Sequence, residues 1–164
     1  MPLLSELATA VKARRQEMGL SQEKLASLAG LSRVTINELE TGKLVNLSLT
    51  RAERLANLLG FSMGLANSRT SASARDALDV AAKSASVSFR EELPRDVLKL
   101  ALVRGEAPAR YRPHLRSLLD EAPLSILSNV ASQLELETGV RRQATWQQMR
   151  ALAVQVACAR AIWT

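Results

Sequence analysis

The sequence of 164 residues predicts an all-α protein, and three observations favour this fold class. Hydrophobic residues make up 47% of the chain but aromatic residues only 3%, so the cores must be built from Leu, Ala, Val and Ile. Strand-like alternation is rare, whereas apolar residues recur at helical spacing along most of the chain. Start and stop signals near the N-terminus also mark two short helices. Both halves of the chain are therefore expected to be helical.

The most informative element is this pair of short helices, which are joined by a tight turn. Ser21 and Ser32 suit the N-cap positions of helices over residues 22–29 and 33–40. A serine hydroxyl can accept a hydrogen bond from an unpaired N–H group in the first turn. Gly30 can adopt the left-handed conformation that ends the first helix and reverses the chain.

Each helix of the pair has one apolar side, so each is expected to bury that side. The small side chain of Ala26 allows the second helix to cross the first closely and at a steep angle. This arrangement predicts a helix-turn-helix. The apolar positions of the pair are Leu25, Leu28, Ala29, Leu31, Ile36 and Leu39.

The stretch resembles the helix-turn-helix of the Cro/repressor (XRE) family, which includes phage repressors and HipB- or HigA-like antitoxins. Ala26, Gly30, the apolar set and the Glu-Thr-Gly-Lys of residues 40–43 fall where that family has them. The resemblance extends over about residues 3–60. It implies a lambda-repressor-like helical bundle that binds DNA. The C-terminal part carries no comparable motif.

Two further helices should complete this N-terminal bundle. The first is expected over residues 3–18. In the second, Ser48 or Thr50 caps a helix that continues to about Leu59, and Thr50 with Glu53 fits a capping box. Such a bundle is just large enough to bury one small core.

The chain is expected to divide into a DNA-binding domain (1–63), a linker (64–74) and an all-helical domain for dimerisation or partner binding (75–164). Residues 64–74 lack periodicity and are rich in Gly, Ser and other small residues, although they could instead begin the next helix. The C-terminal helices are expected over residues 74–83, 94–104, 114–121, 123–136 and 143–162.

The second helix of such a motif lies in the major groove with its N-terminal side chains facing base edges. The guanidinium of Arg33 matches the O6 and N7 acceptors of guanine. Val34 could lie against a thymine methyl, and Glu38 could accept from a cytosine amino group or only orient Arg33. The resemblance puts base-reading or neighbouring roles at Arg33, Val34, Thr35 and Glu38.

Contacts with DNA phosphates are expected from the same surface. Gln22 matches a position where the family often carries a phosphate-binding glutamine. Thr41 and Lys43, with backbone N–H groups near Gly42, are expected to form a second clamp. The alternative for each of these residues is simple solvation. The candidate phosphate ligands are Gln22, Ser32, Asn37, Thr41, Lys43, Arg14 and Arg15.

The formal net charge of +6 fits an approach to phosphates, although proteins that bind no nucleic acid can be as basic. One module reads only a few base pairs, so a homodimer on a pseudo-palindromic site is expected. Either residues 44–61 or the C-terminal domain could supply the two-fold contact.

Nothing in the sequence indicates an enzyme, a metal site or a cofactor. The single histidine, His114, lies among arginines with no nucleophile or paired acid nearby, and is expected at the surface. Cys158 is expected to be buried in the last helix, and Asp120 with Glu121 to form a solvated helix end. Trp163 could belong to the core or anchor another chain.

The sequence thus predicts a dimeric repressor that binds double-stranded DNA sequence-specifically. With no signal peptide and no apolar run long enough to span a membrane, it is expected in the cytoplasm, associated with the nucleoid. The alternative is an antitoxin whose C-terminal domain neutralises a partner toxin while the N-terminal domain represses the operon. A third class is a helix-turn-helix used only for protein contacts.

Overall fold

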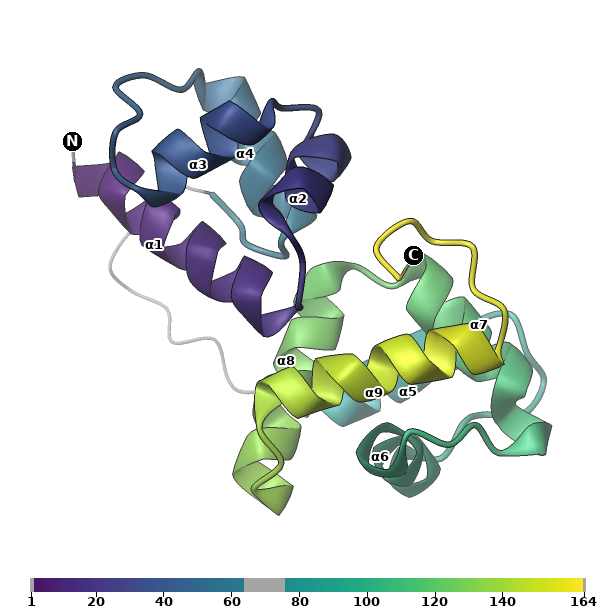
Figure 1. Cartoon of the computed structure of the whole chain (residues 1–164). Helices are drawn as coiled ribbons and strands as arrows, with labels where there is room; N and C mark the ends of the chain where they lie inside the picture. Colours follow the sequence, from purple (N-terminus) through teal and green to yellow (C-terminus); the bar gives the residue numbers. More distant parts are fainter. Residues whose placement is uncertain (1, 64–75, 164) are drawn as a thin grey trace. The chain divides into compact units, whose positions relative to one another are not determined.

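The computed structural model describes residues 2–63 and 76–163. Over these residues the chain forms nine α-helices and one short 3-10 helix, with no strand, which confirms the all-α prediction (Figure 1). The chain folds into two compact units, Met1–Arg69 (unit 1) and Thr70–Thr164 (unit 2). No described helix has both the length and the apolar character needed to cross a membrane.

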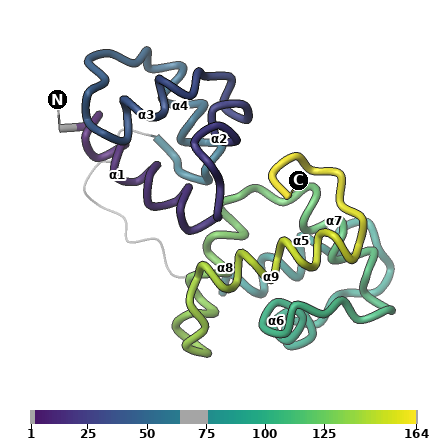
Figure 2. The backbone as a smooth tube through the Cα atoms, viewed as in Figure 1, coloured from purple at the N-terminus to yellow at the C-terminus, as the bar shows by residue number. Residues whose placement is uncertain are grey.

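Unit 1 is a bundle of four helices around one small aliphatic core. Val11, Leu25, Ile36 and Leu55, one from each helix, are fully buried. The second helix packs against the third and the fourth, and the first packs against the same two (Figure 2). The helices are α1 (Pro2–Glu17), α2 (Gln22–Ala29), α3 (Arg33–Glu40) and α4 (Leu49–Leu58).

The predicted helix pair is confirmed with its expected bounds and caps. The hydroxyl of Ser21 accepts from the backbone N–H of Lys24 at 3.0 Å, and that of Ser32 accepts from Thr35 at 3.0 Å. Gly30 has φ +65°, the left-handed conformation that the turn requires. The capping box was wrong, because Thr50 lies inside α4, whose N-cap is Ser48.

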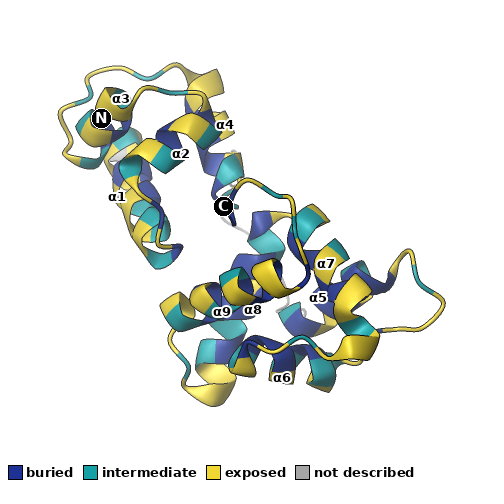
Figure 3. Ribbon diagram, turned by 45° about the vertical axis from the view of Figure 1, so that its right-hand side comes forward, coloured by how far each residue is buried: buried dark blue, intermediate teal, exposed yellow. Residues whose placement is uncertain are grey.

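Over residues 76–163, unit 2 contains five α-helices and the 3-10 helix. Its longest helix, α8, packs against α5 and α9, and the apolar sides of these helices face inward (Figure 3). The core is built largely from leucine and alanine, with Trp146 and Trp163 added. The elements are α5 (Ala77–Ser86), α6 (Arg95–Arg104), η1 (Ala109–Tyr111), α7 (Arg112–Glu121), α8 (Leu124–Thr138) and α9 (Arg142–Gln155).

Both ends of unit 2 differ from the sequence-based prediction. The predicted linker, residues 64–74, lies outside the described residues, and the first described helix begins at Ala77 after the N-cap Asp76. The last helix ends at Gln155 rather than Ile162. The chain then turns at Ala157, whose φ of +53° is left-handed. Trp163 belongs to the core, where its indole N–H donates to the carbonyl of Leu119 at 2.9 Å.

Three polar residues of unit 2 are also placed differently from expectation. His114 is buried rather than exposed, with its ring stacked on Phe89 and its Nε2 2.7 Å from the carbonyl oxygen of Glu91. Asp120 accepts from the backbone N–H groups of Ala159 and Arg160 and is not a solvated helix end. Cys158 lies beyond the last helix and is half-buried, and burial raises the pKa of its thiol to about 12.

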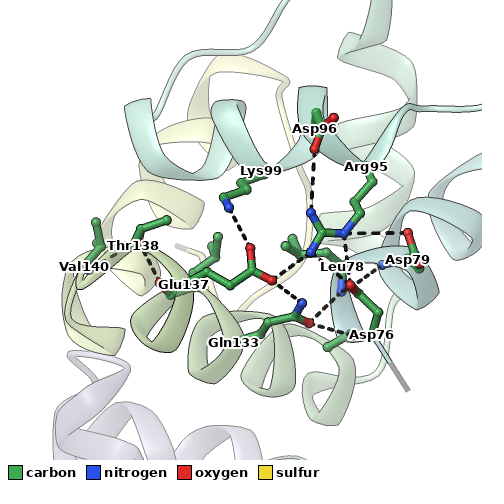
Figure 4. A network of polar contacts seen from close by, with 12 residues as sticks. Asp76, Leu78, Asp79, Arg95, Asp96, Lys99, Gln133, Glu137, Thr138 and Val140 are labelled. Atoms are coloured by element: carbon green, nitrogen blue, oxygen red, sulfur yellow. Dashed lines mark hydrogen bonds and ion pairs between the residues drawn. The ribbon is translucent and has the colours of Figure 1, made fainter. Parts of the chain in front are cut away.

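An ion-pair cluster connects the beginning of α5 to α6 and α8 (Figure 4). The guanidinium of Arg95 donates to Asp76 at 2.9 Å and to Glu137 at 2.7 Å, and Lys99 donates to Glu137 at 2.6 Å. Gln133 accepts from the backbone N–H of Ala77 at 2.7 Å. These contacts hold the beginning of α5 against α6 and α8.

We expect this cluster to make the stability of unit 2 depend on pH. The hydrogen bond from Arg95 lowers the pKa of Asp76 to about 2, and the hydrogen bond from Lys99 lowers that of Glu137 to about 2. The unfolded values are about 4, so the stabilisation is complete above that pH and is lost as pH falls toward 2. Thermal unfolding between pH 6 and pH 2 should show this loss, and Glu137→Gln should flatten it. In Asp96→Asn, which changes a side chain that is 93% exposed, the pH dependence should remain.

Candidate nucleic-acid interface

The α3 helix divides clearly into a buried side and an exposed side. Ile36 and Leu39 are buried in the core of unit 1, whereas Val34 is 64% exposed. Side chains two positions apart in an α-helix point about 200° apart around its axis, so Val34 lies almost opposite Ile36. The outward side of α3 is therefore the side that the sequence predicts to face the bases.

The first turn of α3 presents one cation and one aliphatic side chain. Arg33 is exposed and makes no ion pair with any described residue. The hydroxyl of Thr35 is 2.8 Å from that of Ser32, so these two side chains bind each other beside the exposed pair. The four predicted residues Arg33, Val34, Thr35 and Glu38 share one helix, and their base-reading roles stay predictions.

Glu38 lies one turn beyond Val34 and is half-buried. It makes no ion pair with Arg33 in the described part of the chain, so the structure gives no support to the alternative in which it orients Arg33. Its carbonyl oxygen accepts from the backbone N–H groups of Lys43 at 2.8 Å and Leu44 at 3.0 Å.

The backbone N–H groups that follow α3 were predicted to help Thr41 and Lys43 bind a phosphate. The N–H groups of Thr41, Gly42 and Lys43 all donate to carbonyl oxygens of α3, so the expected backbone contribution to phosphate binding was wrong. The hydroxyl of Thr41 also donates to the carbonyl of Asn37, at 2.8 Å. Lys43 itself is exposed.

Gln22 and Asn37, both predicted to bind phosphate, are in contact with each other. The amide of Asn37 donates to Oε1 of Gln22 at 3.4 Å, and Nε2 of Gln22 donates to Glu40 at 2.9 Å. These two hydrogen bonds hold the side chain of Gln22, the first residue of α2, against α3.

Glu40 is the most important residue of this surface that sequence analysis missed. Its carboxylate receives two hydrogen bonds from Arg15, at 2.6 and 2.8 Å, and the same guanidinium donates to the carbonyl of Leu20. The Glu40 side chain is only 2% exposed and that of Arg15 13%. Burial alone would raise the pKa of Glu40, but the hydrogen bonds from Arg15 and Gln22 outweigh it and lower the pKa. The pair therefore anchors the end of α3 to α1.

The two arginines predicted to bind phosphate both have partners inside unit 1. Arg15 is held by Glu40, and Arg14 lies 4.0 Å from Glu17 with its guanidinium 5.0 Å from the centre of the Phe61 ring. Their contact with DNA stays a prediction, while Lys43 and Arg33 are the more accessible cations.

Two comparisons with known proteins found a match. Residues 11–65 match the Helix-turn-helix family. A stretch of 54 residues is 43% identical to an uncharacterized HTH-type transcriptional regulator of Methanothermobacter thermautotrophicus, and covers 33% of this chain and 77% of that protein. No solved structure matches the chain at a significant level.

Proposed function

This chain belongs to the helix-turn-helix transcriptional regulators, and we propose that it is a repressor that binds a palindromic DNA operator sequence-specifically as a homodimer. The observation that carries the proposal is the exposed first turn of α3. Arg33 offers a planar donor with no ion-pair partner among the described residues, and Val34 lies beside it on the side opposite the buried Ile36. A short helix of this kind fits the major groove of a duplex.

We propose that phosphates on either side of this helix are bound by Lys43 and Gln22. Lys43 supplies an exposed charge just beyond the end of α3, and Gln22 begins α2 with its amide oriented by Glu40. A lysine that neutralises one phosphate releases counterions, so its contribution depends on salt but not on base sequence.

Dimerisation would double the number of base pairs read. Val45, between α3 and α4, is 90% exposed, and Leu49, the first residue of α4, is 70% exposed, so residues 44–61 carry exposed apolar side chains. These residues make residues 44–61 one candidate for the two-fold contact, and unit 2, which exposes Val87 and Leu136, is the other. Burying them against a second copy would remove apolar surface from water.

Selection of bound duplexes from a random pool with the full-length chain tests the proposal. We expect enrichment of one short sequence that occurs twice, in inverted orientation, about one helical turn apart. Footprinting and sedimentation of the complex then give the half-site spacing and the number of chains. Retention of all duplexes alike would contradict sequence-specific binding.

Lys43→Ala is expected to weaken binding to every duplex by a similar factor. The logarithm of the binding constant falls linearly with the logarithm of the salt concentration. This dependence should become shallower by about 1 for each phosphate that the protein no longer neutralises. The check is a salt titration of the selected operator and of an unrelated duplex, monitored by fluorescence anisotropy. Lys83→Ala, which changes an exposed lysine of unit 2, serves as the matched control. A weakening confined to the operator would assign Lys43 to the bases instead.

A second candidate function is that of an antitoxin, which is favoured by the existence of unit 2 with a core of its own. A DNA-binding unit does not need this second core to read its site. Co-expression with the neighbouring open reading frame distinguishes the two functions. A stable complex and rescue of growth would identify unit 2 as a toxin-binding domain.

A further inference from the structure

Three exposed arginines lie on η1 and α7 of unit 2, and we propose that they bind an acidic segment of a partner protein. We call Arg110, Arg112 and Arg116 the α7 arginine surface. The proposal concerns unit 2 alone and does not rest on DNA binding by unit 1.

The charge of the α7 arginine surface is the first argument. Residues 108–116 contain its three arginines but no acidic residue and no lysine. The side chains of Arg110 and Arg116 are 70% and 55% exposed. Arg112 and Arg116 are four residues apart on α7, so they lie on the same side of the helix. A surface of this kind attracts an anionic partner.

The ion pairs of the three arginines show how much of this charge is available. Arg110 pairs with Glu91, and Arg116 lies 3.5 Å from Asp120, whose carboxylate also accepts from two backbone N–H groups. Arg112 makes no ion pair with any residue that the structure describes. The acidic residues of unit 2 therefore neutralise only part of the α7 arginine surface.

The pair between Arg110 and Glu91 shows how this surface holds a carboxylate. Nε of Arg110 donates to one oxygen of Glu91 at 3.0 Å, and Nη2 contacts the other oxygen. The hydroxyl of Tyr111 also donates to this carboxylate, at 3.4 Å. Binding both oxygens with one guanidinium is the arrangement by which arginine recognises carboxylates. Arg112 can offer the same geometry to a carboxylate from another chain.

The backbone around the α7 arginine surface is already held in place. Gln155 of α9 accepts from the N–H of Ala107 at 3.1 Å, which fixes the loop before η1. The buried His114 of α7 has its Nε2 2.7 Å from the carbonyl oxygen of Glu91. A surface that is ordered beforehand loses less conformational entropy when a partner binds.

The composition favours a protein over a nucleic acid as the anionic partner. Protein interfaces are enriched in arginine and depleted in lysine, whereas phosphate backbones are bound by both. The α7 arginine surface has no lysine, while unit 1 carries Lys12, Lys24 and Lys43. We therefore expect aspartate and glutamate side chains to be the groups that it binds.

The test uses the full-length protein and a fluorescein-labelled peptide of alternating glutamate and serine, with binding followed by anisotropy at low salt. We expect the wild-type protein to bind this peptide. The double variant Arg112→Gln, Arg116→Gln should bind it about tenfold less tightly, because each exposed ion pair contributes up to about fivefold in affinity. Both side chains are exposed, so the variant should melt at the wild-type temperature.

The double variant Arg141→Gln, Arg142→Gln is the matched control. It removes the same charge from two exposed arginines at the beginning of α9. The 14 residues of α9 place these arginines about 20 Å from Gln155, which contacts the loop before η1. The control should bind the peptide like the wild-type protein. Equal weakening in the two double variants, or no binding by the wild-type protein, would overturn the proposal.

A labelled DNA duplex of random sequence is the second probe, and it separates a protein partner from a nucleic acid. Arg112→Gln, Arg116→Gln should change the affinity for this duplex no more than the control does. If affinity for the duplex falls together with affinity for the peptide, the α7 arginine surface binds phosphates and the acidic-protein proposal is wrong. Loss of peptide binding alone supports the proposal, whether or not unit 1 selects an operator.

Discussion

Arg33→Ala is expected to lower operator affinity by about 1–3 kcal/mol and to relax the requirement at one base position in each half-site. Arg33 is exposed at the start of α3 and has no ion pair among the described residues, so its removal should leave the fold of unit 1 intact. The affinity difference would be that of a planar guanidinium donating to two acceptors of guanine. Affinity for operators with each base substituted in turn is the measurement.

Arg33→Lys keeps the positive charge but cannot donate two parallel hydrogen bonds to one base. It therefore separates the contribution of charge from that of base recognition. We expect it to restore non-specific binding while the base preference remains relaxed. An equal weakening on all duplexes for Arg33→Ala would reassign this residue to the phosphate backbone.

Glu40→Ala should destabilise unit 1 by about 3 kcal/mol. Removal of this carboxylate leaves Arg15 with a largely buried charge and without its two short hydrogen bonds, and frees the amide of Gln22. A four-helix unit of about 60 residues has little stability to spare, so the change should unfold a measurable fraction of it. Hydrogen exchange followed by mass spectrometry is the measurement. We expect faster exchange over residues 2–63 and unchanged exchange over residues 76–163.

The exposed ion pair between Arg110 and Glu91 provides a matched comparison. Glu91→Ala removes the same charge from a pair that water already screens, so the free energy of unfolding should change by less than about 1 kcal/mol. Similar effects of the two substitutions would show that burial does not distinguish the pairs.

The helix-turn-helix could be predicted from the sequence because its signals are local. The two serine caps act on N–H groups three residues away, and the left-handed turn requires a glycine at position 30. The anchoring of α3 could not be predicted in this way. Arg15 and Glu40 are 25 residues apart, and nothing nearby in the sequence distinguishes Arg15, with its buried partner, from an arginine that binds DNA.

The end of the last helix shows the same limit. The sequence around Ala157 is rich in alanine and contains no glycine, so its helical periodicity suggested continuation to Ile162. The helix ends earlier because distant groups bind the chain that follows it. Asp120 accepts from two backbone N–H groups, and the Trp163 indole donates to Leu119. These interactions exist only after α7 has packed against α9.

In α3, different residues hold the helix in place and face outward, and this separation affects how such a regulator could acquire new targets. Ile36, Leu39 and Glu40 hold the helix in place, whereas Arg33 and Val34 have no share in the interior. Exchange of the outward pair alone should therefore redirect the protein to another promoter at almost no thermodynamic penalty. Duplicated copies of such a gene could diverge in target through very few codons, and an engineer could retarget this scaffold in the same way.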